Sequence, residues 1–123
     1  MQNKLLLIFC VLGFMGGCTC NRDNAPDAKT PVIRGIYSFG PELSTFIECG
    51  TGREFWITDS IEKLENAYSQ QGFEKPYEPV YIEVKGRKKI SLPNGAEGDY
   101  DSTVIVKELI RISKDIPENC QPK

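Results

Sequence analysis

From residue 32 onward, short runs rich in β-branched and aromatic side chains alternate with turn-forming glycine and proline. Residues 32–39 form the first run, which ends at Gly40-Pro41 and therefore predicts a strand followed by a turn. Residues 45–49 and 53–58 are two further runs, and Gly50-Thr51-Gly52 joins them. A short connection with two glycines is typical of a tight antiparallel reversal in which the backbone φ is positive. These two runs therefore predict a hairpin.

At Asp59 the period changes from two residues to about 3.6, which predicts one amphipathic helix. Asp59 suits the N-cap position, and Glu62 follows three residues later, as a capping box requires. Gly72 suits the left-handed position that ends a helix. The face that we expect to be buried carries Ile61, Leu64, Ala67 and Tyr68.

A long strand pattern follows the helix, and Gly86 marks the point where we expect this strand to bend. Residues 93–101 predict a loop, and residues 103–112 predict a last strand. Glu108 breaks the alternation of that last strand, and a bulge near Lys107 would restore it. The apolar residues of the long strand that share one parity are Val80, Ile82, Val84, Ile90 and Leu92.

Three strands, one helix and two further strands are the element order of an OB-fold. This fold is a small five-stranded Greek-key barrel with a helix after its third strand. The predicted fold class is therefore mainly β, with one helix between strands three and four. The spacing of the elements fits a generic small β-barrel equally well.

The first eighteen residues have the pattern of a bacterial lipoprotein export signal. Lys4 is followed by an apolar run over residues 5–12, and Gly16-Gly17-Cys18 resembles a lipobox. The run is shorter than the roughly 20 residues that span a bilayer. We therefore expect residues 1–17 to be removed and Cys18 to carry the lipid anchor. Met15 stands where such boxes usually carry Leu, so ordinary secretion is the alternative. Thr19 is not the Asp typical of inner-membrane retention, which favours the outer membrane, facing the periplasm.

Residues 18–31 are polar and without apolar period, which predicts a flexible tether ahead of a single domain over residues 32–123. Without residues 1–17 the chain has 14 basic and 17 acidic residues. This mildly acidic balance argues against nucleic acid as a partner, because phosphate binding needs a clustered basic surface.

The chain contains no histidine. Ser-His-Asp and Cys-His catalysis and His-containing zinc sites are therefore excluded. Only carboxylate or lone-thiol chemistry is left, and no paired base accompanies it. We expect neither an enzyme nor a bound cofactor.

Three short motifs occur in a characteristic order: Arg34-Gly35-Ile36-Tyr37, then Phe46-x-x-Cys49-x-x-Gly52-Arg53, then Leu64-Glu65-x-Ala67-Tyr68. Together they resemble the C-terminal OB-fold domain of the NlpE outer-membrane lipoproteins. The resemblance covers about residues 32–120 and includes a Val-rich strand over residues 80–86. It implies an OB barrel in a family of envelope sensors that report lipoprotein sorting, surface contact, copper or disulfide faults to a two-component stress system. Full-length members also have an N-terminal domain with a Cys-x-x-Cys motif. The tether occupies its place here, which puts both signalling and copper binding in doubt.

The resemblance also implies a disulfide between Cys49 and Cys120, since the family domain carries a second cysteine near its C-terminus. Cys10 leaves with the signal and Cys18 is expected to be acylated, so Cys20 is the remaining thiol. The disulfide is either a structural staple or a redox reporter. Cys20 is a weak candidate for copper, because thiolates favour Cu(I); a spare thiol or an intermolecular disulfide is the alternative.

Two charged stretches admit a plain and a functional interpretation. Residues 87–89 (Arg-Lys-Lys) form a basic run that is either a solvated edge or a contact for anionic headgroups or a partner. Glu97, Asp99 and Asp101 alternate as calcium ligands can, but the EF-hand spacing is absent.

A binding face is predicted from the aromatic and basic residues of the first three strands. Its candidates are Arg34, Tyr37, Phe46 and Trp56, with core packing as the alternative for Phe46 and Trp56. We therefore expect a lipid-anchored envelope protein with an OB-like binding or sensing domain and an envelope protein as partner. A structural scaffold in an envelope lipoprotein complex is the first alternative, and a copper-binding lipoprotein is the second.

Overall fold

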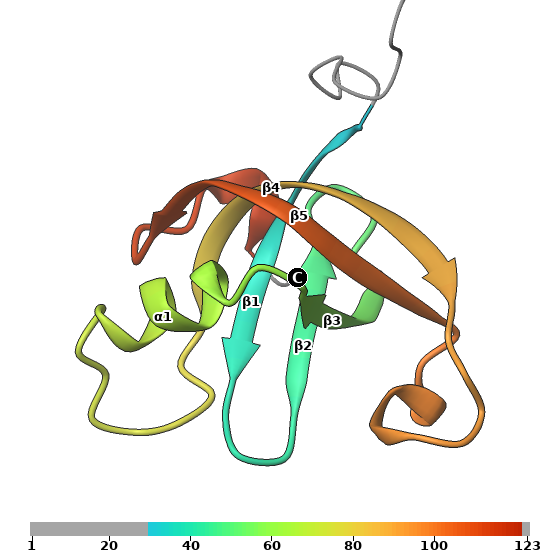
Figure 1. Ribbon diagram of the computed structural model, residues 1–123. Helices are drawn as coiled ribbons and strands as arrows, with labels where there is room; N and C mark the ends of the chain where they lie inside the picture. Colours follow the sequence, from blue (N-terminus) through green and yellow to red (C-terminus); the bar gives the residue numbers. More distant parts are fainter. Residues whose placement is uncertain (1–29, 122–123) are drawn as a thin grey trace, which may run out of the picture.

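A computed structural model describes residues 30–121 of the chain. The expected signal, Cys18, Cys20 and most of the tether lie outside the described residues. Figure 1 shows the elements in the order of the sequence. They are β1 (Val32–Phe39), β2 (Ser44–Glu48), β3 (Glu54–Asp59), α1 (Lys63–Ser69), β4 (Val80–Ile90), the 3-10 helix η2 (Ala96–Asp99), β5 (Ser102–Ser113) and the 3-10 helix η3 (Glu118–Cys120).

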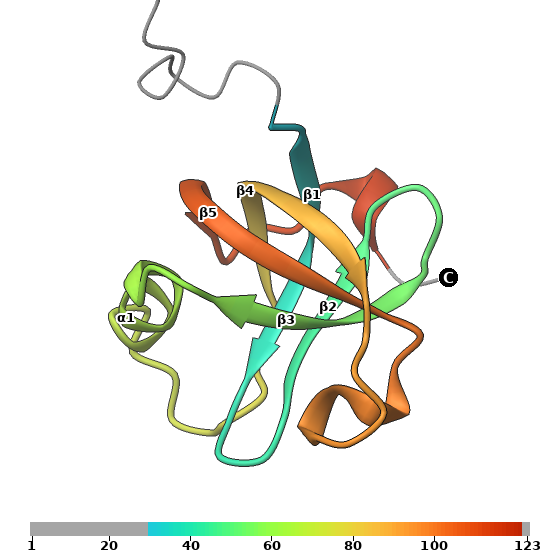
Figure 2. The same ribbon diagram turned by 45° about the vertical axis from the view of Figure 1, so that its right-hand side comes forward.

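The five strands close into a barrel in the order β1-β2-β3-β5-β4, and β4 returns to pair with β1 (Figure 2). The β3–β5 pair is parallel and the other pairs are antiparallel. This arrangement confirms the predicted OB-fold. Alternate residues of the strands point into the barrel and, with two residues of α1, form the core. The core consists of Ile33, Tyr37, Phe46, Phe55, Ile57, Leu64, Tyr68, Val80, Ile82, Val84, Val104 and Val106.

The β4–β5 ladder contains two irregularities that let these long strands curve around the barrel. Lys85 pairs with Glu108 and Gly86 pairs with Val106, so Lys107 bulges out of β5. The bulge predicted near Lys107 is thus confirmed. A Cβ atom at Gly86 would collide with a backbone carbonyl oxygen of β5, which explains the glycine at the predicted bend. A second bulge follows further along β5.

Ile90 and Leu92 share the parity of the buried residues of β4 but not their burial. Their exposed fractions are 83% and 60%, whereas the alternating residues earlier in β4 are fully buried. Lys88, between them and the core, lies over the ring of Phe55 at 4.8 Å and pairs with Glu48 at 2.8 Å. The Lys88 side chain covers that end of the barrel, so Ile90 and Leu92, which follow it, have no part of the core to pack against.

The helix begins later than predicted, and the capping box does not form. Glu62 has a left-handed φ of 58°, and α1 starts at Lys63. Asp59 still caps the helix, because its carboxylate accepts hydrogen bonds from the amides of Leu64 (2.8 Å) and Glu65 (3.0 Å). Gly72 has the positive φ, 72°, that was predicted for the end of the helix. Along residues 30–121, no helix has the length and apolar character needed to cross a bilayer.

Candidate functional site

A hollow of about 340 Å³ lies between the β1–β2 loop and η2. The loop contributes residues 39–44, β3 contributes residues 56–59, and Glu65 of α1 and Ala96 of η2 also line it. In OB-folds the β1–β2 and β4–β5 loops frame the usual ligand face. We call this hollow the OB groove.

The OB groove is lined by the single tryptophan of the chain. Trp56 lies between Phe55 and Ile57, which are both buried, so strand alternation directs its ring out of the barrel. The ring is half-buried and lies beside Tyr100 of the β4–β5 connection, with the centroids 5.8 Å apart. An outward-facing aromatic pair beside a hollow provides a surface on which a ligand can pack or stack.

The β1–β2 loop is fixed by contacts with Tyr77, which precedes β4. The Tyr77 amide donates to the Phe39 carbonyl at 3.0 Å, and the Tyr77 hydroxyl accepts from the Glu42 amide at 3.1 Å. Within the loop, the Gly40 amide donates to the Leu43 carbonyl at 3.0 Å. These three hydrogen bonds brace the loop against the segment that precedes β4.

The β4–β5 connection is fixed by the carboxylate of Glu97. It accepts from the Thr103 hydroxyl at 2.6 Å and from the Leu92 amide at 3.1 Å, and Lys89 lies 3.4 Å away. The Thr103 hydroxyl, followed by the Leu92 amide, holds the pKa of Glu97 below its ordinary value. With both loops braced in this way, the OB groove is pre-formed.

The acidic stretch around Glu97 is thus used in folding the loop. In the described part of the chain, no cluster of three or more metal-ligating side chains is found. Nothing in the arrangement of Glu97, Asp99 and Asp101 therefore supports the calcium interpretation.

The OB groove is acidic. Glu42, Asp59 and Glu65 line it, and no basic side chain is among its lining residues. Burial raises the pKa of Glu65, and the negative charges of Asp59 and Glu62 raise it further. The groove therefore favours positively charged ligands over negatively charged ones.

A buried phenol lies close to these groups. Tyr37 is completely buried, and among the described residues its hydroxyl has no hydrogen-bond partner. Burial raises the pKa of Tyr37 far above its ordinary value, and the charges of Glu65 and Asp59 add to this effect. Ser44 is near enough to oppose the shift, although its geometry makes no hydrogen bond with the phenol.

The four residues predicted to form one binding face do not share a surface. Tyr37 and Phe46 are both completely buried in the core, so they cannot line an exposed face. Arg34 points outward from β1 and pairs with Glu83 of β4 at 3.3 Å. Only Trp56 lies in the OB groove. The reason is the alternation of each strand, which turns Arg34 and Tyr37 to opposite sides of β1.

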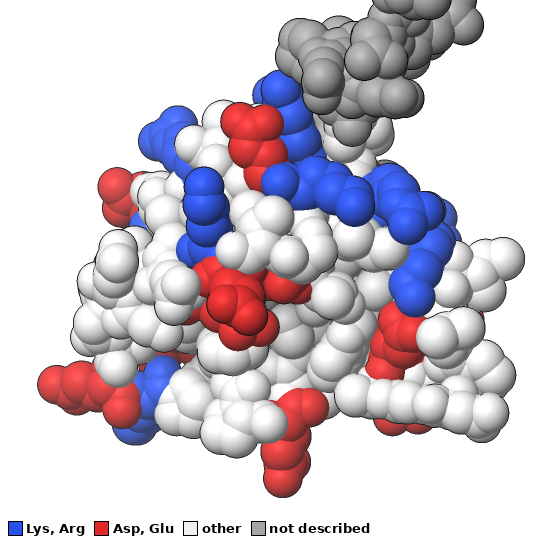
Figure 3. Space-filling view, in the orientation of Figure 1, with Lys and Arg blue, Asp and Glu red and all other residues white. Residues whose placement is uncertain are grey.

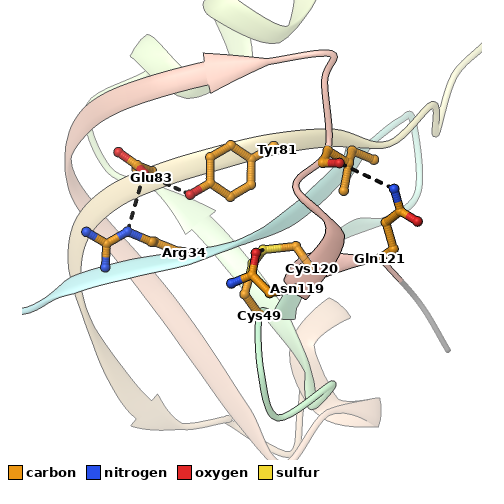
Figure 4. Close-up of a disulfide and its surroundings, with 8 residues drawn as sticks. Arg34, Cys49, Tyr81, Glu83, Asn119, Cys120 and Gln121 are labelled. Atoms are coloured by element: carbon orange, nitrogen blue, oxygen red, sulfur yellow. Dashed lines mark hydrogen bonds and ion pairs between the residues drawn. A yellow bond between two sulfur atoms is a disulfide. The ribbon is translucent and has the colours of Figure 1, made fainter.

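Cys49, directly after β2, and Cys120, in η3, are joined by a disulfide in the structure. Figure 4 shows this bond beneath Tyr81 and beside the Arg34–Glu83 ion pair. The bond attaches the C-terminal segment, residues 114–121, to the outside of the barrel. We call this segment the tail.

The tail covers a second, smaller apolar cluster. Ile36 and Tyr81 point outward from β1 and β4, yet each is only 5% exposed, because the tail packs over them. Every hydrogen bond that residues 115–121 make within the described structure goes to a residue of the stretch 113–121. The disulfide and the contacts of Ile116 and Cys120 are therefore what hold the end of the tail to the barrel.

Several site residues were missed from the sequence. Tyr100 and Glu42 lie in loops without periodic pattern, and Leu43 is a 45% exposed apolar residue at a turn. The loop positions expected for the OB ligand face could have indicated them as a group. Ile36 and Tyr81 point outward and are nevertheless buried, because a segment distant in the sequence covers them. The residues next to them in the sequence do not indicate this burial.

A closed five-stranded barrel, with a helix between β3 and β4 and a groove between its β1–β2 and β4–β5 loops, defines an OB-fold domain. A family model described as the NlpE C-terminal OB domain matches residues 27–121. The chain belongs to this family, which is one of envelope-stress-related lipoproteins.

The chain is similar to the crystal structure of the Cpx pathway activator NlpE from Escherichia coli, with a TM-score of 0.54 and 20% sequence identity. The match covers 68% of this chain and 40% of that one, so this chain spans well under half of the solved protein. At this identity the likeness shows the fold alone. A comparison with curated proteins gives no significant match.

Proposed function

We propose that the protein is a lipid-anchored envelope protein whose OB domain is a binding and sensing module linked to envelope stress. The observation that carries this proposal is the OB groove, which is pre-formed, has an outward-facing aromatic residue and lies where OB-folds usually bind their ligands. The link to stress comes from the family, in which the E. coli protein is a Cpx pathway activator. Cys18 is the proposed lipid attachment site, at the outer membrane facing the periplasm.

The chemistry of the groove limits what it can bind. Its three carboxylates, from Glu42, Asp59 and Glu65, repel the phosphates of nucleic acid. Trp56 and Tyr100 offer ring faces that attract cations. The proposed ligand is therefore a segment of an envelope protein that carries Lys or Arg together with apolar side chains.

A scaffold without a ligand site is the weaker proposal. A scaffold predicts a flat, charged face without a hollow, whereas this face combines a hollow with a half-buried tryptophan. An enzymatic role finds no support in the groove, where carboxylates occur without a histidine or a free thiol among the lining residues.

In-cell photo-crosslinking tests the binding proposal. A photo-reactive residue at Leu43 or Thr58, both exposed in the groove, should give a discrete crosslinked protein band. The same residue at Thr51, an exposed threonine of the β2–β3 connection outside the groove, is the matched control for Thr58 and should not give that band. The band should also disappear with Trp56→Ala. Equal bands from the groove and control positions, or none at all, would contradict the proposal.

Redox reporting by the disulfide is a second candidate function. A hollow of about 390 Å³, lined by residues 47–52 of the β2–β3 hairpin and residues 119–121 of the tail, lies beside the Cys49–Cys120 bond. Reductants can therefore approach it, and reduction would release the tail and expose Ile36 and Tyr81. Thiol alkylation in cells tests this idea: a thiol-reactive tag should label both cysteines in cells deficient in disulfide formation and neither in normal cells. Labelling of both Cys49 and Cys120 in normal cells would contradict a redox role, because it would mean that the disulfide does not form there.

Copper binding by Cys20 is the remaining proposal, and it lies outside the described residues. Acylation of Cys18 turns its sulfur into a thioether, which removes one thiolate of the Cys-x-Cys pair. Copper titration of the lipidated protein and of its Cys20→Ser variant decides the matter, because equal binding would exclude a role for Cys20.

A further inference from the structure

The outer surface of β1, β4 and β5 carries a cluster of basic side chains that the OB groove does not use. Across these three neighbouring strands, Arg34 faces Glu83, and Glu83 faces Arg111. The next row along contains Lys85 opposite Glu108. Arg87 follows two residues later on the same side of β4, and Lys107 is the residue that the β5 bulge pushes outward. We call Arg34, Lys85, Arg87, Lys107 and Arg111 the basic face.

The charge of the basic face is not balanced by its own acidic residues. Glu83 pairs with Arg34 at 3.3 Å, and Glu108 pairs with Lys85 at 3.7 Å. Arg87, Lys107 and Arg111 are exposed and form no ion pair within residues 30–121. A chain that is acidic overall therefore concentrates excess positive charge on one surface.

The basic face lies where the described domain begins. Val32, the first residue of β1, pairs with Lys85, and the Gly86 amide donates to the Pro31 carbonyl at 3.2 Å. Figure 3 shows that most of the Lys and Arg atoms on this side gather along the upper part of the molecule, where β1 starts, and that Asp and Glu are more frequent lower down. Two exposed apolar side chains, Val32 (40%) and Ile110 (44%), accompany the basic residues.

We infer that the basic face docks on phosphate-bearing, anionic lipid headgroups. Positive charge with scattered apolar side chains is the pattern that binds a membrane surface. The 14 residues of 18–31 span at most about 50 Å even when fully extended, so an anchor at the proposed site Cys18 confines this face to the neighbourhood of the bilayer. The cations can therefore reach the roughly 8 Å over which a charged surface acts at physiological salt.

Docking of the basic face on the membrane would determine which way the OB groove faces. β1 runs from the basic face to the β1–β2 loop, and its eight residues span about 26 Å. The groove therefore lies at the end of the barrel away from the basic face and would be turned toward the periplasm. The inference goes beyond the proposed binding function and does not depend on it.

Vesicle sedimentation tests the inference. The mature chain, residues 18–123 with Cys18→Ser and Cys20→Ser to exclude lipid and crosslinking, is mixed with vesicles of phosphatidylcholine that contain phosphatidylglycerol. Each basic residue near an anionic surface contributes roughly fivefold to the partition coefficient. The double variant Arg87→Glu and Lys107→Glu should therefore bind at least roughly 25-fold more weakly. Binding should also fall steeply with salt and be absent with pure phosphatidylcholine.

The double variant Lys63→Glu and Lys75→Glu is the matched control, because it changes the net charge equally on α1 and on the segment after it. It should bind within twofold of the parent chain, and urea unfolding midpoints should show that both variants are folded. Binding that is equal for anionic and neutral vesicles, or an equal loss in both variants, would overturn the inference. If the basic face binds an acidic protein and not lipid, binding to anionic and neutral vesicles should be equal. The crosslinking test of the groove is unaffected by either outcome.

Discussion

Replacement of both disulfide cysteines, Cys49→Ser with Cys120→Ser, is expected to destabilise the domain strongly while leaving the barrel formed. The two cysteines are 71 residues apart in the sequence. Closing a loop of this length lowers the entropy of the unfolded chain by an amount worth about 4 kcal/mol at 25 °C. A small domain has a total stability of about 5–15 kcal/mol, so the loss is a large fraction of it.

The structure also says where the effect should begin. Residues 115–121 make their hydrogen bonds only within the C-terminal stretch 113–121, so in this variant the tail is held mainly by the apolar contacts of Ile116. We therefore expect the tail to detach in the folded variant, exposing Ile36 and Tyr81, before the barrel unfolds.

Urea unfolding followed by the fluorescence of Trp56, the single tryptophan, measures the stability of the barrel. Limited trypsin digestion after Lys114 measures detachment of the tail. The mature chain with Cys20→Ser is the control and should match the parent in both assays. A loss below about 1 kcal/mol in the double variant would refute the loop-closure reasoning. Unchanged protection of Lys114 would refute the idea that the disulfide is what holds the tail.

Three further predictions concern single residues of the barrel. Tyr37→Phe removes a buried hydroxyl without a partner and should stabilise the domain by about 1 kcal/mol at pH 7 in urea unfolding. Because burial raises the pKa of Tyr37, its phenol loses the proton at a lower pH in the unfolded chain than in the folded protein. The stability of the domain should therefore fall as the pH rises through 10, and Tyr37→Phe should reduce this fall. Glu97→Gln should flatten the decline of stability below pH 4.5. The Thr103 hydroxyl lowers the pKa of Glu97 in the folded protein. The ionised carboxylate of Glu97 therefore stabilises the fold fully above pH 4.5, and this stabilisation is lost as the pH falls through the lowered pKa of the folded state. An unchanged acid profile would contradict this. Gly86→Ala should lower the free energy of unfolding by about 2 kcal/mol, because the added Cβ meets a backbone carbonyl oxygen of β5. Gly95→Ala is the control and should be neutral, because the added Cβ meets open space. Equal effects of the two substitutions would show that β5 can move to make room for the Cβ.

Much of the fold could be predicted from local pattern. The change of period at Asp59, the glycines of the β2–β3 hairpin and the interruption at Glu108 each produce a nearby structural consequence: a helix, a tight reversal and a bulge at Lys107. Such features are set by backbone sterics and by the alternation of side chains along one strand, which neighbouring residues determine.

The helix start shows the limit of this local reasoning. Asp59 caps the helix as its residue type predicted, but from four residues before Lys63, because the intervening Glu62 adopts a left-handed conformation. Cap chemistry can be read from residue type, whereas the exact register depends on how the chain leaves β3 and packs α1 on the barrel.

The sequence by itself determined the family, the order of the elements and the alternation of each strand. Tertiary structure alone decided which side of a strand is covered. Tyr37 and Ile36 are adjacent on β1 and point in opposite directions, yet both are buried, the first by the core and the second by the tail that Cys120 fixes. Trp56 obtains its place in the OB groove in the same way, because barrel closure brings the β1–β2 loop and η2 to either side of it. Alternation fixes the direction of a side chain, but the segment that it meets comes from far along the chain, and only closure of the barrel brings the two together.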